Sequence, residues 1–320
     1  MQAVQVTEYG APVRICCLDV PTPAAGQVLV RVAACGLNFG DTLLIKGRYQ
    51  ERPALPFTLG MELAGRVEAV GAGVTDFTVG QRIAACCGVG GLAEFAAIDA
   101  RICVPIPDAM PFTDAAAFLI AYATSHLALE EKARLQPGER LLVLGASGGV
   151  GLTAVELGKL MGAEVIACAR GAEKLANCAR LGADYLIDTD VDDIRDSVKA
   201  LGGADVVYDP VGGAQFEAAM RAANVGARLL PLGFASGDVP QIPANILLVK
   251  NMTVLGFYLG GFAKLNPDAL TRSLAKLLEW YAAGDLKPHV SNILPLTEVN
   301  EGLNLLRTRM ATGKVVIKIG

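Results

Sequence analysis

The sequence predicts an α/β protein in which a doubly wound parallel sheet is joined to a smaller β-rich, barrel-like domain. From about residue 113, apolar strand patterns alternate with helical ones, as in a parallel sheet covered by helices on both faces. Before that residue, short strands of alternating polarity are separated by Gly and Pro every several residues. The length of 320 residues allows two domains with separate cores. The hydrophobic fraction of 52% fits this fold, because the strands of a covered parallel sheet are apolar on both sides.

The strand and helix patterns follow one another in the order that this fold requires. The β-rich part contains strand patterns at 28–33, 64–70 and 94–98. A helical pattern at 113–129 begins the α/β part, whose strand candidates lie at 141–145, 163–169, 185–188, 205–208, 227–232 and 252–257. The last part of the chain has a helix near 270–283 that carries the only Trp, and a closing strand at 314–319.

The most informative segment is Leu141–Leu160, which reads as a buried strand, a tight turn of small residues and a helix. Ala146, Gly148 and Gly151 occupy the three small-residue positions of a dinucleotide-binding fingerprint. The first makes the turn, the second lets the backbone approach a pyrophosphate, and the third lets the helix pack on the strand. The flanking strand and helix favour cofactor binding over the alternative, a glycine-rich surface turn. We expect backbone groups here to bind the phosphates, from Ser147, Gly148, Gly149, Val150 and Gly151.

The residue that follows the next strand indicates which dinucleotide binds. Arg170 stands where an NAD-binding protein has Asp or Glu, about 20 residues after the turn. A carboxylate would repel a 2′-phosphate, whereas a guanidinium donates two parallel hydrogen bonds to it. Arg170, together with Lys174, therefore favours NADPH over NADH, while Glu173 is expected to face solvent. The alternative is an ordinary solvated pair of cations at the start of a helix.

Composition and charge argue against several other classes of protein. The net charge is −4 with no basic block, which argues against a nucleic-acid partner. No uninterrupted run of about 18 apolar residues is present, so no membrane span is predicted. The first residues, Met1–Val6, form a strand pattern rather than a signal peptide, and a cytoplasmic location is expected. The eight cysteines lack any Cys-x-x-Cys spacing, so we expect buried, reduced side chains rather than a metal site or disulfides.

Several longer motifs resemble the medium-chain dehydrogenase/reductase superfamily, and within it the zinc-independent quinone oxidoreductases and related enone reductases. The resemblance covers essentially the whole chain. Its markers are Gly36-Leu-Asn-Phe-Gly-Asp41, Gly60-Met-Glu-Leu-Ala-Gly65, the segment Val70–Arg82, the turn Gly145–Gly151, Leu181-Gly-Ala-Asp184 and Gly313-Lys-Val-Val-Ile317. It implies a GroES-like catalytic domain built from residues 1–118 and 261–320, with a Rossmann-type dinucleotide-binding domain at 119–260.

The residues that bind zinc in related enzymes are replaced in this chain. Zinc-dependent alcohol dehydrogenases of the superfamily have a Cys at the position of Asn38 and a His at the position of Met61, whereas Glu62 is retained. Amide and thioether groups are poor zinc ligands, and the four-cysteine structural zinc loop is also absent from the sequence. We therefore predict no metal. Alcohol oxidation is disfavoured without a Lewis acid, whereas reduction of an electron-poor alkene or quinone needs no such help.

Three residues in the segment 38–49 are the candidates for catalysis. In the related quinone and enoyl-thioester reductases, residues matching Asn38, Asp41 and Tyr49 line the nicotinamide pocket. Tyr49 is expected to donate a hydrogen bond to the substrate oxygen that gains charge as hydride arrives. The alternatives are structural. The Tyr49 ring belongs to the core, Asp41 caps a helix and Asn38 is required only by its loop.

Two further residues are expected on the cofactor side. Thr124 resembles a cofactor-facing hydroxyl, with a hydrogen bond to its own helix as the alternative. Phe234 follows a sheet strand where family members contact the nicotinamide half of the cofactor, with a plain core aromatic as the alternative. Many quinone oxidoreductases also have a Tyr near the 2′-phosphoribose, shortly after the Gly-Ala-Asp motif. This chain reads Tyr185-Leu-Ile-Asp-Thr-Asp190 there, without a Tyr at the usual position.

The functional hypothesis is an NADPH-dependent reductase that transfers hydride to quinones or α,β-unsaturated carbonyl compounds without zinc. One alternative is an enoyl-thioester (acyl-CoA) reductase, and another is a non-catalytic NADPH-binding protein with a structural or regulatory role. A homodimer is also expected, because Met252–Phe257 reads as an apolar edge strand, and such edges are usually covered or paired.

Overall fold

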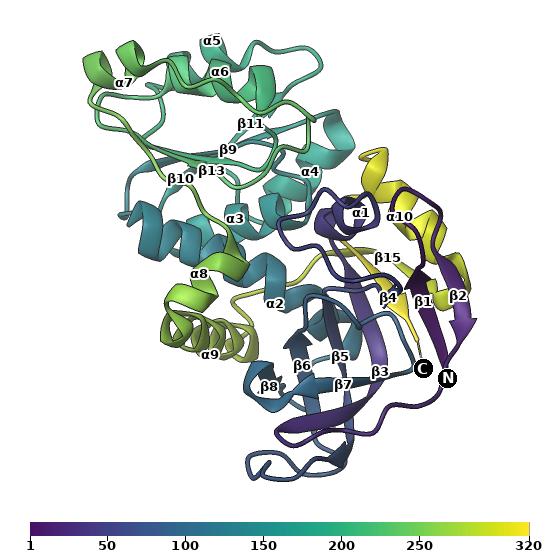
Figure 1. Cartoon of the computed structure of the whole chain (residues 1–320). Coiled ribbons are helices and arrows are strands. Elements are labelled where there is room, and N and C mark those ends of the chain that lie inside the picture. Colours follow the sequence, from purple (N-terminus) through teal and green to yellow (C-terminus); the bar gives the residue numbers. More distant parts are fainter. Residues whose placement is uncertain (320) are drawn as a thin grey trace. The chain divides into compact units, whose positions relative to one another are not determined.

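The computed structural model describes residues 1–319, which form two compact units (Figure 1). The first unit comprises Met1–Ile120 together with the segment that begins at Pro288, and the second unit is Ala121–Lys287. The second unit is therefore a continuous piece of chain, whereas the first is assembled from both ends of the sequence. The predicted α/β class, with a β-rich domain and a parallel-sheet domain, is confirmed.

The first unit contains a three-stranded and a seven-stranded sheet. The smaller sheet has the order β2-β1-β4, and the larger has the order β15-β16-β3-β5-β6-β8, with β7 paired to β3. Their strands are β1 (Gln2–Val6), β2 (Arg14–Cys17), β3 (Gln27–Leu37), β4 (Phe57–Thr58), β5 (Glu62–Val70), β6 (Arg82–Cys86), β7 (Phe95–Asp99), β8 (Cys103–Pro105), β15 (Val290–Pro295) and β16 (Lys314–Lys318). The helices α1 (Phe39–Ile45) and α10 (Val299–Arg307) belong to the same unit.

The C-terminal strand completes the larger sheet by pairing with its longest strand. β16 runs antiparallel to β3, with Val315 opposite Leu37, and β3 is also paired with β5. β16 is almost entirely buried, which explains the run Lys-Val-Val-Ile at its start. This pairing brings residues near positions 37, 62 and 314 together, although they are far apart in the sequence.

The second unit contains the predicted parallel sheet, whose six strands have the order β11-β10-β9-β12-β13-β14. Its strands are β9 (Arg140–Val143), β10 (Glu164–Ala169), β11 (Tyr185–Asp188), β12 (Val206–Asp209), β13 (Arg228–Pro231) and β14 (Thr253–Val254). Its helices include α3 (Gly149–Leu160), α4 (Ala172–Arg180), α5 (Ile194–Ala200), α6 (Gly213–Ala222), α7 (Ala244–Lys250), α8 (Leu259–Leu265) and α9 (Pro267–Ala283). The helix α2 (Phe112–Leu127) contains the boundary between the units.

The predicted edge strand at 252–257 is longer than the observed one. β14 has only two residues, and beyond it the N–H of Leu255 still donates to the carbonyl of Leu229. Phe257 then leaves the sheet and packs against Phe262 of α8, with ring centroids 5.4 Å apart. The apolar residues after Val254 therefore serve helix packing rather than a continued strand.

The predicted return to the first domain at residue 261 is wrong, because α8 and α9 belong to the second unit and the return comes at Pro288. The contacts of α9 with the end of α2 explain the difference. The Nδ1 of His126 lies 2.9 Å from the Ser273 hydroxyl, and its ring meets Trp280 edge-on at 5.4 Å. The other boundary is at 120/121, close to the predicted 118/119.

One helical segment is long and apolar enough to cross a membrane if only length and composition are considered. This segment, Phe112–Ala133, consists of α2 and the π-helical turn Ala128–Ala133. In the folded chain, 72% of its most apolar window is buried against protein, which is the environment of a core helix.

Candidate functional site

The fingerprint turn brings the start of α3 very close to the end of the preceding strand. A Cβ on Gly151 would lie 2.2 Å from the carbonyl oxygen of Gly145 and 2.8 Å from Cα of Ala146. No side chain fits at that distance, so the third small residue permits the helix–strand contact that the sequence predicts. Ala146 is completely buried, and its N–H donates to the carbonyl of Cys168 on β10.

The N-terminus of α3 is left open for a ligand. Gly148 is its N-cap, and no side chain within residues 1–319 caps the helix by a hydrogen bond. The N–H groups of Gly149, Val150 and Gly151 have no acceptor inside the helix, as at any helix start. A Cβ at Gly148 would have only the carbonyl oxygen of Gly145 within 4 Å, at 3.4 Å, so the space beside this residue is otherwise empty. Free N–H groups, the helix dipole and an open approach are the features that hold a pyrophosphate.

A buried network of hydroxyl groups fixes this helix start within the second unit. The Ser125 hydroxyl donates to the carbonyl of Val150 at 3.0 Å, and it lies 2.7 Å from the Thr153 hydroxyl and 2.8 Å from the Tyr208 hydroxyl. These contacts connect α2, α3 and β12. The hydroxyl predicted from the sequence was that of Thr124, which is half-buried on the same helix. The rotation of α2 that turns Ser125 inward is set by packing, so no local pattern distinguishes the two hydroxyls.

Two cations lie together after β10. Arg170 is exposed and Lys174 is half-buried in the first turn of α4. Partial burial lowers the pKa of Lys174, and the neighbouring Arg170 guanidinium lowers it further. Between them, the N–H of Gly171 donates to the Asp188 carboxylate at 2.9 Å, which fixes the loop. A dianionic phosphate would relieve the repulsion between these two cations, so the pair suits such a ligand.

Phe234 is on the loop that follows β13 and is 41% exposed. This exposure argues against the alternative of a plain core aromatic. Thus the residues expected on the cofactor side all belong to the second unit, whereas Asn38, Asp41 and Tyr49 belong to the first.

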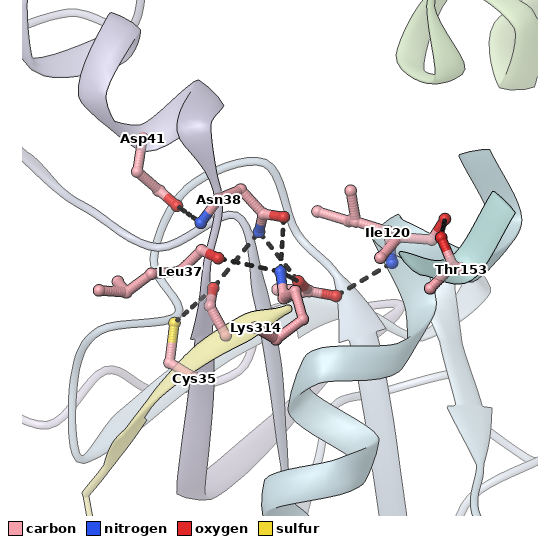
Figure 2. Close-up of polar contacts among 10 residues, drawn as sticks. Cys35, Leu37, Asn38, Asp41, Ile120, Thr153 and Lys314 are labelled. Carbon is pink, nitrogen blue, oxygen red and sulfur yellow. Dashed lines mark hydrogen bonds and ion pairs between the residues drawn. The ribbon is translucent and has the colours of Figure 1, made fainter. Parts of the chain in front are cut away.

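The first unit contains a buried polar cluster made by Asn38, Glu62 and Lys314 (Figure 2). Asn38 follows β3, while the other two residues begin β5 and β16. The Lys314 ammonium donates to Asn38 Oδ1 at 2.7 Å and to Glu62 Oε1 at 2.8 Å. The Asn38 amide nitrogen donates to the same Glu62 oxygen at 2.9 Å. Glu62 is completely buried and Lys314 is 6% exposed.

These contacts direct the Asn38 amide toward the protein interior. Its oxygen accepts from Lys314, and its nitrogen donates to Glu62 and, at 3.3 Å, to the carbonyl of Gly36. Glu62 was recognisable in the sequence as a retained acid, but its partner was missed. The only local signal was a lysine at the start of the apolar strand 314–319, and that pattern does not reveal which residue the lysine meets.

Asp41 is completely buried in the first turn of α1. Its Oδ2 accepts from the backbone N–H of Asn38 at 2.8 Å, which is one half of a capping box and matches the structural alternative for this residue. Burial raises the pKa of Asp41 to about 7, although the Asn38 N–H and the charge of Lys314 act in the opposite direction. Glu62 is the carboxylate in direct contact with the single ammonium of the cluster.

Tyr49 is half-buried and packs against the apolar core of the first unit. A Cβ on Gly40 would lie 3.1 Å from Tyr49 Cε2 and 2.7 Å from Met61 Sδ, so the glycine makes room for both side chains. Tyr49 is therefore placed beside Met61, the residue at the histidine position of the zinc-dependent enzymes.

The donors of the first unit do not fit a zinc ion. Asn38 and Met61 offer an amide and a thioether, and the carboxylate of Glu62 is already paired with an ammonium that would repel a dication. Across residues 1–319, no group of three or more His, Cys, Asp or Glu side chains is arranged to hold a metal ion.

The buried carboxyl of Asp41 makes the free energy of unfolding depend on pH. A carboxyl whose pKa rises from 3.8 to about 7 on folding stabilises the protein fully below pH 3.8, and this stabilisation is lost as the pH rises toward 7. At about 1.4 kcal/mol per pKa unit, the loss between pH 5 and pH 8 is on the order of 2–3 kcal/mol. Asp41→Asn, which resembles the protonated acid, should flatten this pH dependence in urea unfolding. The exposed Asp108→Asn is the matched control, and an unchanged pH slope in Asp41→Asn would contradict the assignment.

The comparisons with known proteins agree with these features. The model of the alcohol dehydrogenase GroES-like domain matches residues 24–108, and the model described as zinc-binding dehydrogenase matches residues 149–279. A quinone oxidoreductase-like protein 2 homolog from Nematostella vectensis is 41% identical, covering 99% of this chain and 88% of that protein.

Solved structures show the same likeness over the whole chain. A quinone oxidoreductase from Thermus thermophilus, also solved in complex with NADPH, is 34% identical with a TM-score of 0.87, covering 99% of this chain and 100% of that one. The Escherichia coli quinone oxidoreductase complexed with NADPH is 27% identical with a TM-score of 0.93, at the same coverage. The chain therefore belongs to the medium-chain dehydrogenase/reductase superfamily, as one of its quinone oxidoreductase-like proteins.

Proposed function

We propose that this protein is an NADPH-dependent reductase that transfers hydride to quinones or α,β-unsaturated carbonyl compounds without zinc. The observation that carries the proposal is the open N-terminus of α3 combined with the adjacent cations Arg170 and Lys174. The first suits a pyrophosphate and the second a 2′-phosphate. The two related quinone oxidoreductases whose structures contain NADPH support the same cofactor.

The choice of substrate class depends on the chemistry of the first unit. An alcohol must lose its hydroxyl proton during oxidation, and relatives that do this use a metal as Lewis acid. Here the corresponding positions hold Asn38 and Met61, next to a carboxylate neutralised by Lys314. Electron-poor alkenes and quinones accept hydride without that assistance.

NADPH supplies the hydride when it is bound, and the protein supplies orientation and charge stabilisation. We assign to Tyr49 the hydrogen bond to the carbonyl oxygen on which negative charge develops. Solvent delivers the final proton. Asn38 and Asp41 are assigned to holding the segment that carries Tyr49, because their polar groups contact protein.

The direct test is consumption of NADPH and NADH with a panel of quinones, small enones and enoyl-CoA thioesters. We expect turnover of a quinone or enone with NADPH and much weaker turnover with NADH. Turnover confined to the enoyl-CoA compounds would favour the enoyl-thioester reductase. Tight NADPH binding with no turnover would favour a non-catalytic role, and stoichiometric zinc in the active protein would refute zinc independence.

Arg170→Ala tests the basis of the cofactor preference. Loss of one charge-assisted contact costs about 1.5–3 kcal/mol, so the Kd for NADPH should rise roughly 10- to 100-fold. The Kd for NADH, which lacks the phosphate, should stay near its wild-type value. Arg195→Ala removes an exposed arginine of the same unit and serves as control. An unchanged Kd for NADPH in Arg170→Ala would show that the phosphate binds elsewhere.

Tyr49→Phe separates catalysis from packing, because it keeps the ring and removes only the hydroxyl. We expect kcat on an enone to fall at least about tenfold, with NADPH affinity and Tm close to wild type. Quinones, which are more electron-poor, should be affected less. Tyr185→Phe, on an exposed strand of the second unit, is the control. Full enone activity in Tyr49→Phe would mean that water or the cofactor ribose contacts the oxygen instead.

We also propose that the protein is a cytoplasmic homodimer. β14 ends the parallel sheet, and the adjacent α7 exposes Leu248 and Val249 at 77% and 72%. An apolar helix beside an open sheet edge is a surface that a second copy would cover. A monomer by light scattering at micromolar concentration would exclude the dimer.

A further inference from the structure

Lys314 is the cation of the polar cluster, and all three of its N–H donors are used within the first unit. They reach the carbonyl of Leu37 at 2.9 Å, Asn38 Oδ1 at 2.7 Å and Glu62 Oε1 at 2.8 Å. The proposed reaction does not use this residue directly. All three donors are engaged and only 6% of the residue is exposed, so the three acceptors hold the ammonium in place.

The acceptors around this ammonium coincide with the positions that matter for zinc in the superfamily. Asn38 stands at a cysteine ligand position, and Glu62 follows Met61, which stands at a histidine ligand position. The Lys314 ammonium therefore contacts Asn38 and Glu62, two residues whose counterparts in the zinc-dependent relatives lie at or beside the metal.

The cluster also controls the segment that carries Tyr49. Lys314 fixes the side chain of Asn38, whose backbone N–H is held by Asp41 in the first turn of α1. α1 then ends at Ile45, four residues before Tyr49. The path from the ammonium to the tyrosine therefore consists of two hydrogen bonds and one short helix.

We propose that Lys314 is a positioning residue that orders the segment 38–49 through its contacts with Leu37, Asn38 and Glu62. It sets the conformation of the segment 38–49 and thereby the place of the Tyr49 hydroxyl, without touching the substrate. The proposal rests on the function proposed above for Tyr49, but the conformational part is measurable without any substrate.

The experiment compares Lys314→Met with the double variant Lys314→Met/Glu62→Gln. The single change leaves Glu62 as a buried, unpaired carboxylate and should lower the Tm. The double variant removes that charge, while the glutamine oxygen still accepts the N–H of Ile120, which donates to Glu62 at 3.0 Å. Lys318→Met, an exposed lysine on the same strand, is the control. Tm, the Kd for NADPH, kcat and KM are measured, together with amide hydrogen exchange of peptides covering 38–49 and 149–160.

In the double variant we expect the Tm to recover most of the loss, whereas kcat on an enone stays at least about tenfold below wild type. The Kd for NADPH should change less than about twofold. Exchange should accelerate in 38–49 and remain unchanged in 149–160. Recovery of both kcat and wild-type exchange in the double variant would overturn the proposal, because Lys314 would then serve only to neutralise Glu62.

Lys314→Arg keeps the result decisive if neither methionine variant folds. Its planar guanidinium retains the charge but cannot direct three hydrogen bonds to the same acceptors, so reduced kcat and faster exchange in 38–49 are expected. Wild-type values of both would overturn the proposal. If the wild-type protein consumes NADPH with no member of the panel, the proposed function fails. The exchange measurements still decide whether Lys314 orders the segment.

Discussion

The carboxylate of Glu62 is the interaction on which the arrangement of the first unit depends. One of its oxygens accepts from Asn38 and Lys314, and the other accepts from the backbone N–H of Ile120. Four segments that are widely separated in sequence therefore meet at a single side chain. Removing one member of a buried ion pair typically costs about 3–5 kcal/mol, since the remaining charge has no solvent to stabilise it. These contacts give Glu62 a structural role that does not require a zinc ion.

Features of the second unit were predictable because they depend on neighbours in the sequence. The strand–turn–helix at 141–160 and the cation that follows the next strand are local patterns, and the small size of position 151 is required by contacts within six residues. The parallel sheet itself was also predictable, because strand patterns alternate with helical ones along this part of the chain. The length of β14 was not predictable, because Phe257 leaves the sheet to pack on a helix that comes later in the chain.

The contacts of the first unit were harder to predict, because the residues that meet there are far apart in the sequence. Lys314 and Glu62 are 252 positions apart, and in the second unit His126 likewise meets Ser273 across 147 positions. No periodicity or spacing rule connects such pairs, so the partner of Glu62 and the unit to which α9 belongs were both missed. The sequence also did not single out Ser125, the neighbour of Thr124 that joins the buried hydroxyl network. Adjacent residues on a helix differ by about 100° in direction, and only the packed structure shows which one faces inward.

The division of the first unit between two distant parts of the chain has a consequence for biosynthesis. A ribosome completes Ala121–Lys287 as one continuous piece, which contains every strand of the parallel sheet. Asn38 and Glu62 are synthesised early, but β16 emerges only with the last few residues described. Until then β3 lacks one of its partner strands, and the acid at position 62 lacks its counterion. The nascent chain therefore carries an incomplete sheet until β16 has been made, and the unpaired edge of β3 is open to aggregation during that time.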